Sequence, residues 1–365
     1  MNARVLLSPI AALLAVVIAS DGGNAVAQGF AGLGSTAEGF AMPRQGIALS
    51  FPEDHGPHPE YRIEWWYMTA NLKAADGTDY GVQWTLFRSA LAPGDTKGWD
   101  SQQIWMGHAA VTATAKHYVA ERLARGGIGQ AGVTAEPFSA WIDDWQMRGR
   151  ATPGMAGAGS DALSALDLRA SGTDFRYDLK LDARGPLVPQ GEGGYSVKSA
   201  QGQASYYYSQ PFYAVAGTIA LPEGEVEVTG QAWLDREWSS QPLAADQTGW
   251  DWFSLHLDSG EKLMAFRLRD GGDGYMSGTW ISPEGRPSPL SPGELKVTPL
   301  ETARVEGRNL PVSWRVEVPG RNFSVTTEVL NTQAWMKVQF PYWEGPIRFT
   351  GSDDGLGYLE MTGYR

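Results

Sequence analysis

Strict alternation of apolar and polar residues recurs along this chain and constrains its fold more than any other feature. Residues 175–182 place Phe, Tyr and two Leu at every second position, with Arg, Asp, Lys and Asp between them. Residues 82–86, 225–229 and 312–318 follow the same rule. Successive side chains of a strand point to opposite faces, so this period of two predicts antiparallel strands that are half-buried.

Turn signals separate these strands. Asp-Gly or Gly-rich turns stand at residues 75–77, 258–260 and 270–272, and Pro-Glu-Gly stands at residues 283–285. Helical periodicity is scarce, and the best helical candidate is residues 116–125. Many short strands joined by regular turns predict an all-β sandwich or barrel.

A weak internal repeat points to two β-domains. Residues 66–88 and 252–269 each begin with an aromatic pair, pass through a turn at Gly77 or Gly260, and end in Phe-Arg or Leu-Arg. We infer two related β-domains that divide near residue 230, although two unrelated all-β domains would also fit so weak a repeat. A length of 365 residues agrees with about two domains.

The N-terminus has the pattern of a secretory leader. Arg4 precedes an apolar run over residues 5–19, and the small-x-small sequence Ala-Val-Ala ends at Ala27. Such a leader is removed from the mature protein, here before Gln28, and its apolar run is too short to span a bilayer. The predicted organisation is a signal peptide, a flexible lead-in, an N-terminal domain and a C-terminal domain, at residues 1–27, 28–50, 51–230 and 231–365.

Composition narrows the compartment and the partners. The chain has no Cys, so a lipid-anchored leader is excluded and stability must come from burial, which suits a periplasmic or secreted protein. A formal net charge of −12 argues against nucleic acid as a partner and against an anionic membrane surface. We expect no stable membrane insertion after the leader is cleaved.

Carboxylates among tryptophans are the strongest chemical signal. They occur in Glu-Trp-Trp-Tyr at residues 64–67, Trp-Leu-Asp-Arg-Glu-Trp at residues 233–238 and Trp-Asp-Trp-Phe at residues 250–253. A desolvated carboxyl has a raised pKa and can donate a proton near neutral pH. The commoner alternative is a core of Trp residues with Asp235, Arg236 and Glu237 forming a hydrogen-bonded rim.

These motifs and others resemble one known family. Gly-Val-Gln-Trp-Thr-Leu-Phe-Arg at residues 81–88, Trp-Met-Gly-His-Ala at 105–109, Tyr-Tyr-Tyr-Ser at 206–209 and the strings at 230–238 and 249–253 continue the pattern. Together with residues 64–67 they resemble the AttH/CrtC group of carotenoid 1,2-hydratase-like proteins. The resemblance implies two tandem lipocalin-like (calycin) barrels, and many relatives are known as predicted secreted hydrolases.

The resemblance also implies a candidate acid. In the carotenoid hydratases a Tyr-His-Asp-His-Asn-Trp stretch carries the acid that protonates a double bond. Aligning the two Asp residues makes Asp235 the equivalent here, while Trp233 replaces the Tyr, Leu234 and Arg236 replace the two His, and Glu237 replaces the Asn. Related two-barrel proteins act as cyclases, with an apolar cavity as the shared element.

Three weaker sequence signals do not point to an additional activity or bound group. Residues 127–132 match a dinucleotide-binding fingerprint, but their all-β surroundings predict a loop. His55 and His58 lie in a Pro-rich loop without an obvious third ligand, so we expect no metal and no cofactor. A Gly-x-Ser-x-Gly motif is absent from the sequence.

The sequence therefore leaves three functions open. The first is an exported lipocalin-like protein that binds a hydrophobic, isoprenoid-like or lipid-like small molecule in an aromatic-lined cavity and could pass it to an export system. The second is a hydratase, cyclase or isomerase that uses Asp235 or Glu237 as its general acid. The third is a secreted hydrolase with an unidentified nucleophile. The candidate catalytic residues are Asp235 and Glu237, and the candidate ligand-binding residues are Glu64, Trp66, Arg88, His108, Tyr208, Trp233, Trp238, Trp250 and Asp251.

Overall fold

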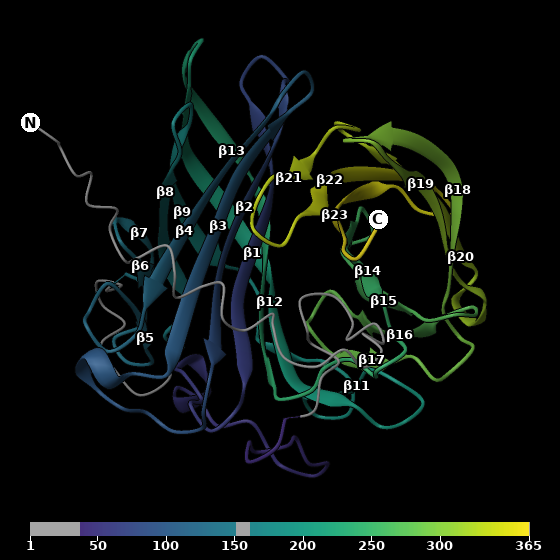
Figure 1. The fold of residues 1–365 in the computed structure, drawn as a ribbon. Helices are drawn as coiled ribbons and strands as arrows, with labels where there is room; N and C mark the ends of the chain where they lie inside the picture. Colours follow the sequence, from purple (N-terminus) through teal and green to yellow (C-terminus); the bar gives the residue numbers. More distant parts are fainter. Residues whose placement is uncertain (1–36, 151–160, 365) are drawn as a thin grey trace, which may run out of the picture.

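The computed structural model describes residues 37–150 and 161–364, which form two curved β-sheets (Figure 1). The predicted leader and the first part of the predicted lead-in lie outside the described residues. Among the described residues, three short 3-10 helices accompany the strands: η3 (Glu53–His55), η4 (Gly98–Asp100) and η5 (Pro319–Arg321). None of the helices among the described residues has the length and apolar character needed to cross a membrane.

The first sheet runs in the order β4-β3-β2-β1-β13-β12-β9-β8-β7-β6-β5, and β10 and β11 pair with β12. Its neighbouring strands are antiparallel. Its strands are β1 (Ile63–Ala74), β2 (Asp79–Ala90), β3 (Gln103–Ala113), β4 (His117–Arg125), β5 (Ala131–Thr134), β6 (Ser139–Ile142), β7 (Trp145–Gly149), β8 (Ala165–Ser171), β9 (Arg176–Ala183), β10 (Val188–Pro189), β11 (Tyr195–Val197), β12 (Ala204–Leu221) and β13 (Gly224–Ser239).

The second sheet runs in the order β17-β16-β15-β14-β23-β22-β20-β19-β18, and β21 pairs with β22. It too is antiparallel. Its strands are β14 (Gly249–Leu257), β15 (Lys262–Arg269), β16 (Tyr275–Ile281), β17 (Pro287–Pro289), β18 (Lys296–Val305), β19 (Arg308–Val318), β20 (Phe323–Val329), β21 (Trp335–Met336), β22 (Tyr342–Gly351) and β23 (Gly355–Met361).

The fold confirms the prediction of an all-β protein with two barrel-shaped sheets. The two halves of the repeat are the hairpins β1–β2 and β14–β15. The helix predicted at residues 116–125 was wrong, because these residues form β4, which pairs with β3 along its whole length. Pairing with the preceding strand in a hairpin outweighs local helical preference. Strand β13 passes through residue 230 and remains in the first sheet to Ser239, so the chain changes sheets downstream of the predicted division.

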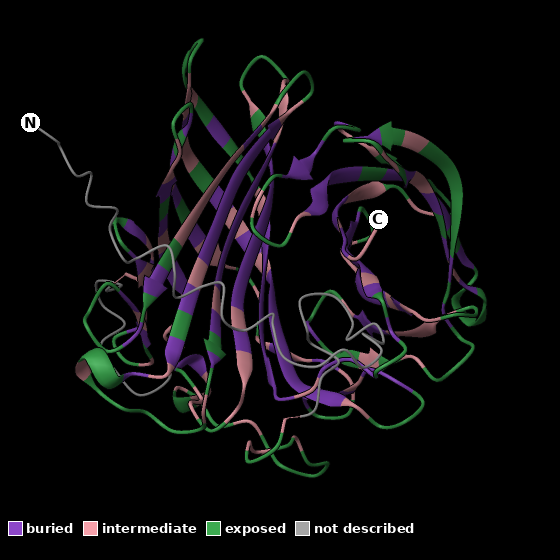
Figure 2. Ribbon diagram, viewed as in Figure 1, coloured by how far each residue is buried: buried purple, intermediate pink, exposed green. Residues whose placement is uncertain are grey.

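Three strands, β1, β12 and β13, separate two hydrophobic cores. Trp66, Leu234 and Trp238 belong to the core inside the first barrel, whereas Tyr67 and Trp233 belong to a core between the two sheets. These central strands are therefore buried on both faces over much of their length (Figure 2). A third core fills the second barrel.

Gly81 of β2 permits the close approach of the two barrels. A Cβ atom at this position would lie 2.5 Å from Cγ of Pro346 in β22 and 2.8 Å from the Tyr358 hydroxyl. Real side chains do not tolerate contacts this short, so a larger residue would push the sheets apart. The missing side chain thus fixes how closely β22 and β23 pack on the first sheet.

Candidate active site

The two carboxylates proposed as catalytic lie on one face of β13, and Arg236 lies on the other. Trp233 and Asp235 alternate with Leu234 and Arg236 along the strand. Asp235 is directly opposite Tyr67 on β1 and Ser209 on β12. Asp235, Arg236 and Glu237 therefore do not form the hydrogen-bonded rim that was the commoner alternative, because a strand sends neighbouring side chains to opposite faces.

Asp235 is buried among neutral hydrogen-bond donors. Hydroxyls of Tyr207 and Ser209 donate to its carboxyl oxygens at 2.6 and 2.5 Å, and the indole of Trp233 donates at 2.6 Å. Burial raises the pKa of Asp235 to about 7, although the three hydrogen bonds favour the charged form. Arg236, the next residue, pairs with Glu64 instead. Asp235 can thus hold a proton near neutral pH.

Glu237 has a different environment, because a cation compensates its charge. Nζ of Lys198 lies 2.9 Å from Oε1 of Glu237. The same ammonium lies over the rings of Tyr207 and Phe266, at 4.7 and 4.4 Å from their centroids. The two carboxyls on one strand face therefore differ in their partners: Asp235 has neutral donors, whereas Glu237 has an ammonium group.

The second sheet adds two buried carboxyls that the sequence analysis did not select. Glu344 of β22 and Glu360 of β23 are direct cross-strand partners. The Tyr67 hydroxyl donates to Oε1 of Glu344 at 2.5 Å, and the Trp250 indole donates to Oε1 of Glu360 at 2.5 Å. Burial raises the pKa of Glu360 to about 7, and the nearby charges of Asp235 and Glu237 add to this effect. Burial also raises the pKa of Glu344 well above its usual range, and the neighbouring Glu360 carboxyl adds to it.

Trp252 joins the carboxyls of the two sheets into one cluster. Its indole donates to the Tyr207 hydroxyl at 3.2 Å, and its ring meets the Tyr67 ring edge-on, with centroids 5.2 Å apart. We name the four acids the carboxyl cluster: Asp235, Glu237, Glu344 and Glu360. Protonatable groups with raised pKa values beside aromatic rings are typical of sites for general acid catalysis.

A separate ionic network occupies the inside of the first barrel. Glu64 accepts hydrogen bonds from Arg88 and Arg236. Burial opposes the charge of Glu64, but the two guanidinium groups outweigh it and hold its pKa well below the usual range. The Arg236 guanidinium also lies between Trp66 and Trp238, 3.9 and 4.9 Å from their ring centroids. One buried carboxylate thus holds two buried guanidinium groups and contacts His58, an arrangement that fits a structural role.

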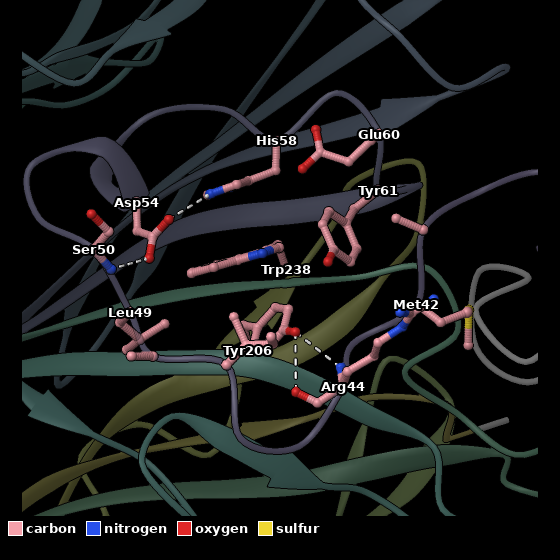
Figure 3. A pocket seen from close by; sticks show the side chains of 13 residues that line it. Met42, Arg44, Leu49, Ser50, Asp54, His58, Glu60, Tyr61, Tyr206 and Trp238 are labelled. Atoms are coloured by element: carbon pink, nitrogen blue, oxygen red, sulfur yellow. Dashed lines mark hydrogen bonds and ion pairs between the residues drawn. The ribbon is translucent and has the colours of Figure 1, made fainter.

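A pocket opens beside this network, at the mouth of the first barrel (Figure 3). Its volume is about 420 Å³, and residues 41–50 form one wall. His58 stacks on Trp238 with the ring planes 4° apart and the centroids 4.1 Å apart. Burial alone would lower the pKa of His58, but hydrogen bonds to Asp54 and Glu64 raise it overall. The pocket therefore mixes aromatic and charged surfaces.

The structure divides the predicted site residues into four places. Asp235 and Glu237 belong to the carboxyl cluster, and Trp233 and Trp250 donate hydrogen bonds to it. Glu64, Trp66, Arg88, Tyr208 and Trp238 lie inside or at the mouth of the first barrel, on the opposite face of the central strands. Asp251 forms an ion pair with Arg269 at 2.5 Å, and burial raises its pKa to about 6.

His108 stands apart, on the outer side of β3. Its Nδ1 atom lies 3.0 Å from the Tyr342 hydroxyl, and its Nε2 atom lies 3.3 Å from Oε1 of Glu121. The imidazole is buried, and burial lowers its pKa. His55 likewise bonds protein groups, Tyr208 and Asp161. Among the described residues, no group of three His, Cys, Asp or Glu side chains is arranged to hold a metal ion.

Sequence reasoning missed a set of residues at the cluster that come from both sheets. One signal could have found the two acids: each stands within a strand, among buried aromatic and apolar residues, where a charge is costly. The tyrosines were quoted in motifs but not chosen. The missed residues are Tyr67, Lys198, Tyr207, Trp252, Glu344 and Glu360.

Comparison with known proteins places this geometry in context. A family model described as AttH-like matches residues 42–364, and no curated protein matches the chain. A solved structure from Nitrosomonas europaea, described as AttH, shares 32% identity with a TM-score of 0.77, over 89% of this chain and 100% of that one.

Two further solved structures share the fold at low identity. Kievitone hydratase from Nectria haematococca shares 16% identity with a TM-score of 0.64, over 90% of this chain and 97% of its own. CghA, in a structure with Sch210972, shares 12% identity with a TM-score of 0.52 and the same coverage.

Proposed function

The chain belongs to the AttH-like family, and we propose that it is an enzyme that protonates a carbon–carbon double bond of an apolar small molecule. Asp235 is the general acid. The observation that carries this proposal is a buried carboxyl whose pKa burial raises to about 7, with neutral donors as its partners. General acids work best when their pKa lies near the working pH.

The aromatic surroundings suit the charge that such a step creates. Protonation of a double bond leaves a carbocation, and the faces of Trp and Tyr rings stabilise cations. Trp233, Trp252 and Tyr67 lie together in the core between the sheets. Water capture of the cation gives a hydratase, loss of a neighbouring proton gives an isomerase, and attack by a second double bond gives a cyclase.

The comparisons support the enzyme class in a general way. A protein named as a hydratase has the same fold, and CghA shares it as well. At this low identity the shared fold does not say which reaction the chain catalyses, so the reaction has to be argued from the site itself. Asp235 and the carboxyl cluster are therefore the basis of the proposal, and the fold is its context.

A carrier of hydrophobic molecules is the second candidate, and the pocket at the barrel mouth favours it. Met42 and Ile47 are exposed apolar residues at its edge, and the rings of Tyr61, Tyr206 and Trp238 line it. The hydrolase alternative has less support, because the Ser209 hydroxyl beside Asp235 donates to that carboxyl instead of contacting a histidine.

Export through a cleaved leader is part of the same proposal. The mature protein is expected to begin at Gln28 and to occupy the periplasm or the medium. N-terminal sequencing of the protein recovered from its own cells tests this point, and an intact Met1 would contradict it.

The test of the enzyme function uses deuterium. Polyenes and isoprenoids, together with any small molecule extracted from the purified protein, are incubated with enzyme in D₂O and analysed by mass spectrometry. An enzyme that protonates carbon transfers deuterium to a C–H position. We expect this transfer with the wild-type protein and its loss in Asp235→Asn.

A matched control separates the site from a general effect of losing a carboxylate. Asp246 is exposed in the segment that joins the two sheets, so Asp246→Asn should leave deuterium transfer unchanged. Undiminished transfer in folded Asp235→Asn would refute the role of Asp235. A molecule that is retained intact, with no deuterium on carbon, would favour the carrier.

A further inference from the structure

Lys262 is a buried lysine in the core that borders the carboxyl cluster. It begins β15 and is only 8% exposed. Side chains at every second position of a strand share a face, so Lys262 lies on the face of Met264 and Phe266. Both of these residues pack in the core between the two sheets, together with Trp233, which donates to Asp235. The amine of Lys262 therefore belongs to the same core as the proposed acid.

The ammonium group of Lys262 has no counter-charge. No acidic side chain in the described part of the chain pairs with it, and burial lowers the pKa of Lys262 to about 8. The adjacent acid, Glu261, accepts a hydrogen bond from the indole of Trp280, whose ring belongs to the core of the second barrel. Lys198 is the contrast, because it is similarly buried but lies 2.9 Å from Oε1 of Glu237. Lys262 is thus the buried amine that can lose its proton near neutral pH.

An aromatic ring lies beside this amine. Nζ of Lys262 is 5.1 Å from the ring centroid of Phe212. Phe212 lies where the pairing of β12 with β13 is irregular, between Gln210 and Tyr213. Such irregularities redirect side chains, here toward the second barrel. A ring face stabilises an ammonium ion and also an iminium ion, the cation that an amine forms with a carbonyl compound.

His256 is directly opposite Lys262, on β14. Burial lowers the pKa of His256 well below its usual range, and the nearby ammonium group adds to this effect, so the imidazole is neutral near pH 7. Its ring meets the Trp233 ring edge-on, with centroids 5.6 Å apart. Among the described residues, Nδ1 of His256 has no hydrogen-bond partner. Buried polar atoms are nearly always paired, so this nitrogen beside an uncompensated amine indicates a polar group of a ligand.

We propose that Lys262 binds the carbonyl group of an apolar aldehyde or ketone covalently, as an imine, and that His256 moves the proton while the bond forms. A desolvated lysine without a counter-charge is the kind that acts as a nucleophile in Schiff-base formation. The proposal deepens the function given above by placing a carbonyl group in the substrate, and in that part it rests on that function.

The reaction balances without an oxidant or a further reactant. The free amine attacks the carbonyl carbon, so a C–N bond forms and the C=O double bond becomes a single bond. His256 takes a proton from the nitrogen and gives one to the oxygen, which yields a carbinolamine. The carbinolamine then loses its hydroxyl group and the remaining nitrogen proton as water, and the C=N bond forms. One amine and one carbonyl group thus become one imine and one water molecule, and hydrolysis reverses the change.

Reductive trapping tests this site lysine by lysine. Folded protein at pH 8 is incubated with a limiting amount of hexanal, reduced with sodium borohydride and digested, and mass spectrometry measures the N-hexyl group on each lysine. Lys296 is the exposed control, on β18. An exposed lysine has a pKa near 10.4, so at pH 8 it has far less free amine than Lys262. We expect Lys262 to be modified at least about tenfold more than Lys296.

Two comparisons separate the folded site from general reactivity. Lys198 is buried but paired, and we expect its modification to stay well below that of Lys262. In protein unfolded with urea, Lys262 and Lys296 should be modified equally, because both amines then meet water. His256→Gln should slow the trapping of Lys262 about tenfold or more, since it removes the group that moves the proton.

Modification of Lys262 at or below the level of Lys296 in the folded protein would overturn the proposal. A preference for Lys262 that persists in urea would also overturn it, because the local sequence and not the folded site would then be its cause. Trapping at the wild-type rate in folded His256→Gln would remove the role of His256.

A second assay tests the substrate class. In the deuterium experiment, Lys262→Arg should lose transfer to isoprenoid aldehydes, and undiminished transfer in the folded variant would refute a carbonyl group as the anchor of the substrate. That result leaves the role of Asp235 intact. Trapping by hexanal needs no proton transfer to carbon, so it is decided independently of the general acid.

Discussion

Asp235→Asn is expected to stabilise the protein above neutral pH while it abolishes proton transfer to substrate. The two side chains have nearly the same shape. The Asn oxygen can accept the hydrogen bonds that Trp233 and Ser209 give to Oδ1, and the Asn amide can donate to the Tyr207 oxygen. The substitution therefore removes the buried charge and keeps the packing.

The size of the gain follows from the pKa of Asp235. Burial raises this pKa from 3.8 to about 7, a shift of about three units, which corresponds to about 4 kcal/mol. Below pH 3.8 the carboxyl is protonated in both the folded and unfolded states, so it contributes nothing to the pH dependence. Between the two values only the unfolded state ionises, and wild-type stability falls as pH rises. Above pH 7 both states are ionised, and the stability of the wild type stays lower by the full cost of the buried charge.

Urea unfolding at several pH values measures this effect. The free energy of unfolding of Asp235→Asn should exceed that of the wild type by a few kcal/mol at pH 8, and the difference should shrink toward zero near pH 4. Glu237→Gln is the contrasting variant, because it leaves buried Lys198 without its partner and should destabilise the protein at both pH values. A gain for Asp235→Asn that does not vary with pH, or a loss at pH 8, would refute the reasoning.

Three further predictions concern the rest of the fold. Glu64→Gln leaves two buried arginines without their carboxylate and should cost about 3–5 kcal/mol in the free energy of unfolding. Glu284→Gln, in a solvent-exposed pair, should leave it nearly unchanged; equal costs in thermal unfolding would contradict this. Gly81→Ala should destabilise by about 1–3 kcal/mol through contact with β22, and Gly271→Ala, with open space around it, should be nearly neutral by the same measurement. The pKa of His58 is raised in the folded protein, so protonated His58 stabilises the fold fully below pH 6.5, and this stabilisation is lost as pH rises through the folded pKa. An NMR titration of His58 with a midpoint at or below 6.5 would contradict this prediction.

Much of the fold could be predicted because period-two alternation is a local property. The hairpins at Gly77 and Gly260 follow from their turn residues and flanking strands, and the structure places β1–β2 and β14–β15 there. Local signals also misled once, at residues 116–125, where charges at helical spacing belong to a strand. The partner that makes it a strand is β3, and pairing between strands is not encoded in the segment itself.

The candidate site could be predicted only in part. The sequence by itself determined that Asp235 and Glu237 are carboxylates among tryptophans, whereas the structure places them in β13, where they share a face. The tertiary structure decided which face that is, and that β14, β22 and β23 cover it with Trp252, Glu344 and Glu360. The physical reason is that a pKa depends on what surrounds the carboxyl, and these surroundings come from a second sheet far along the chain.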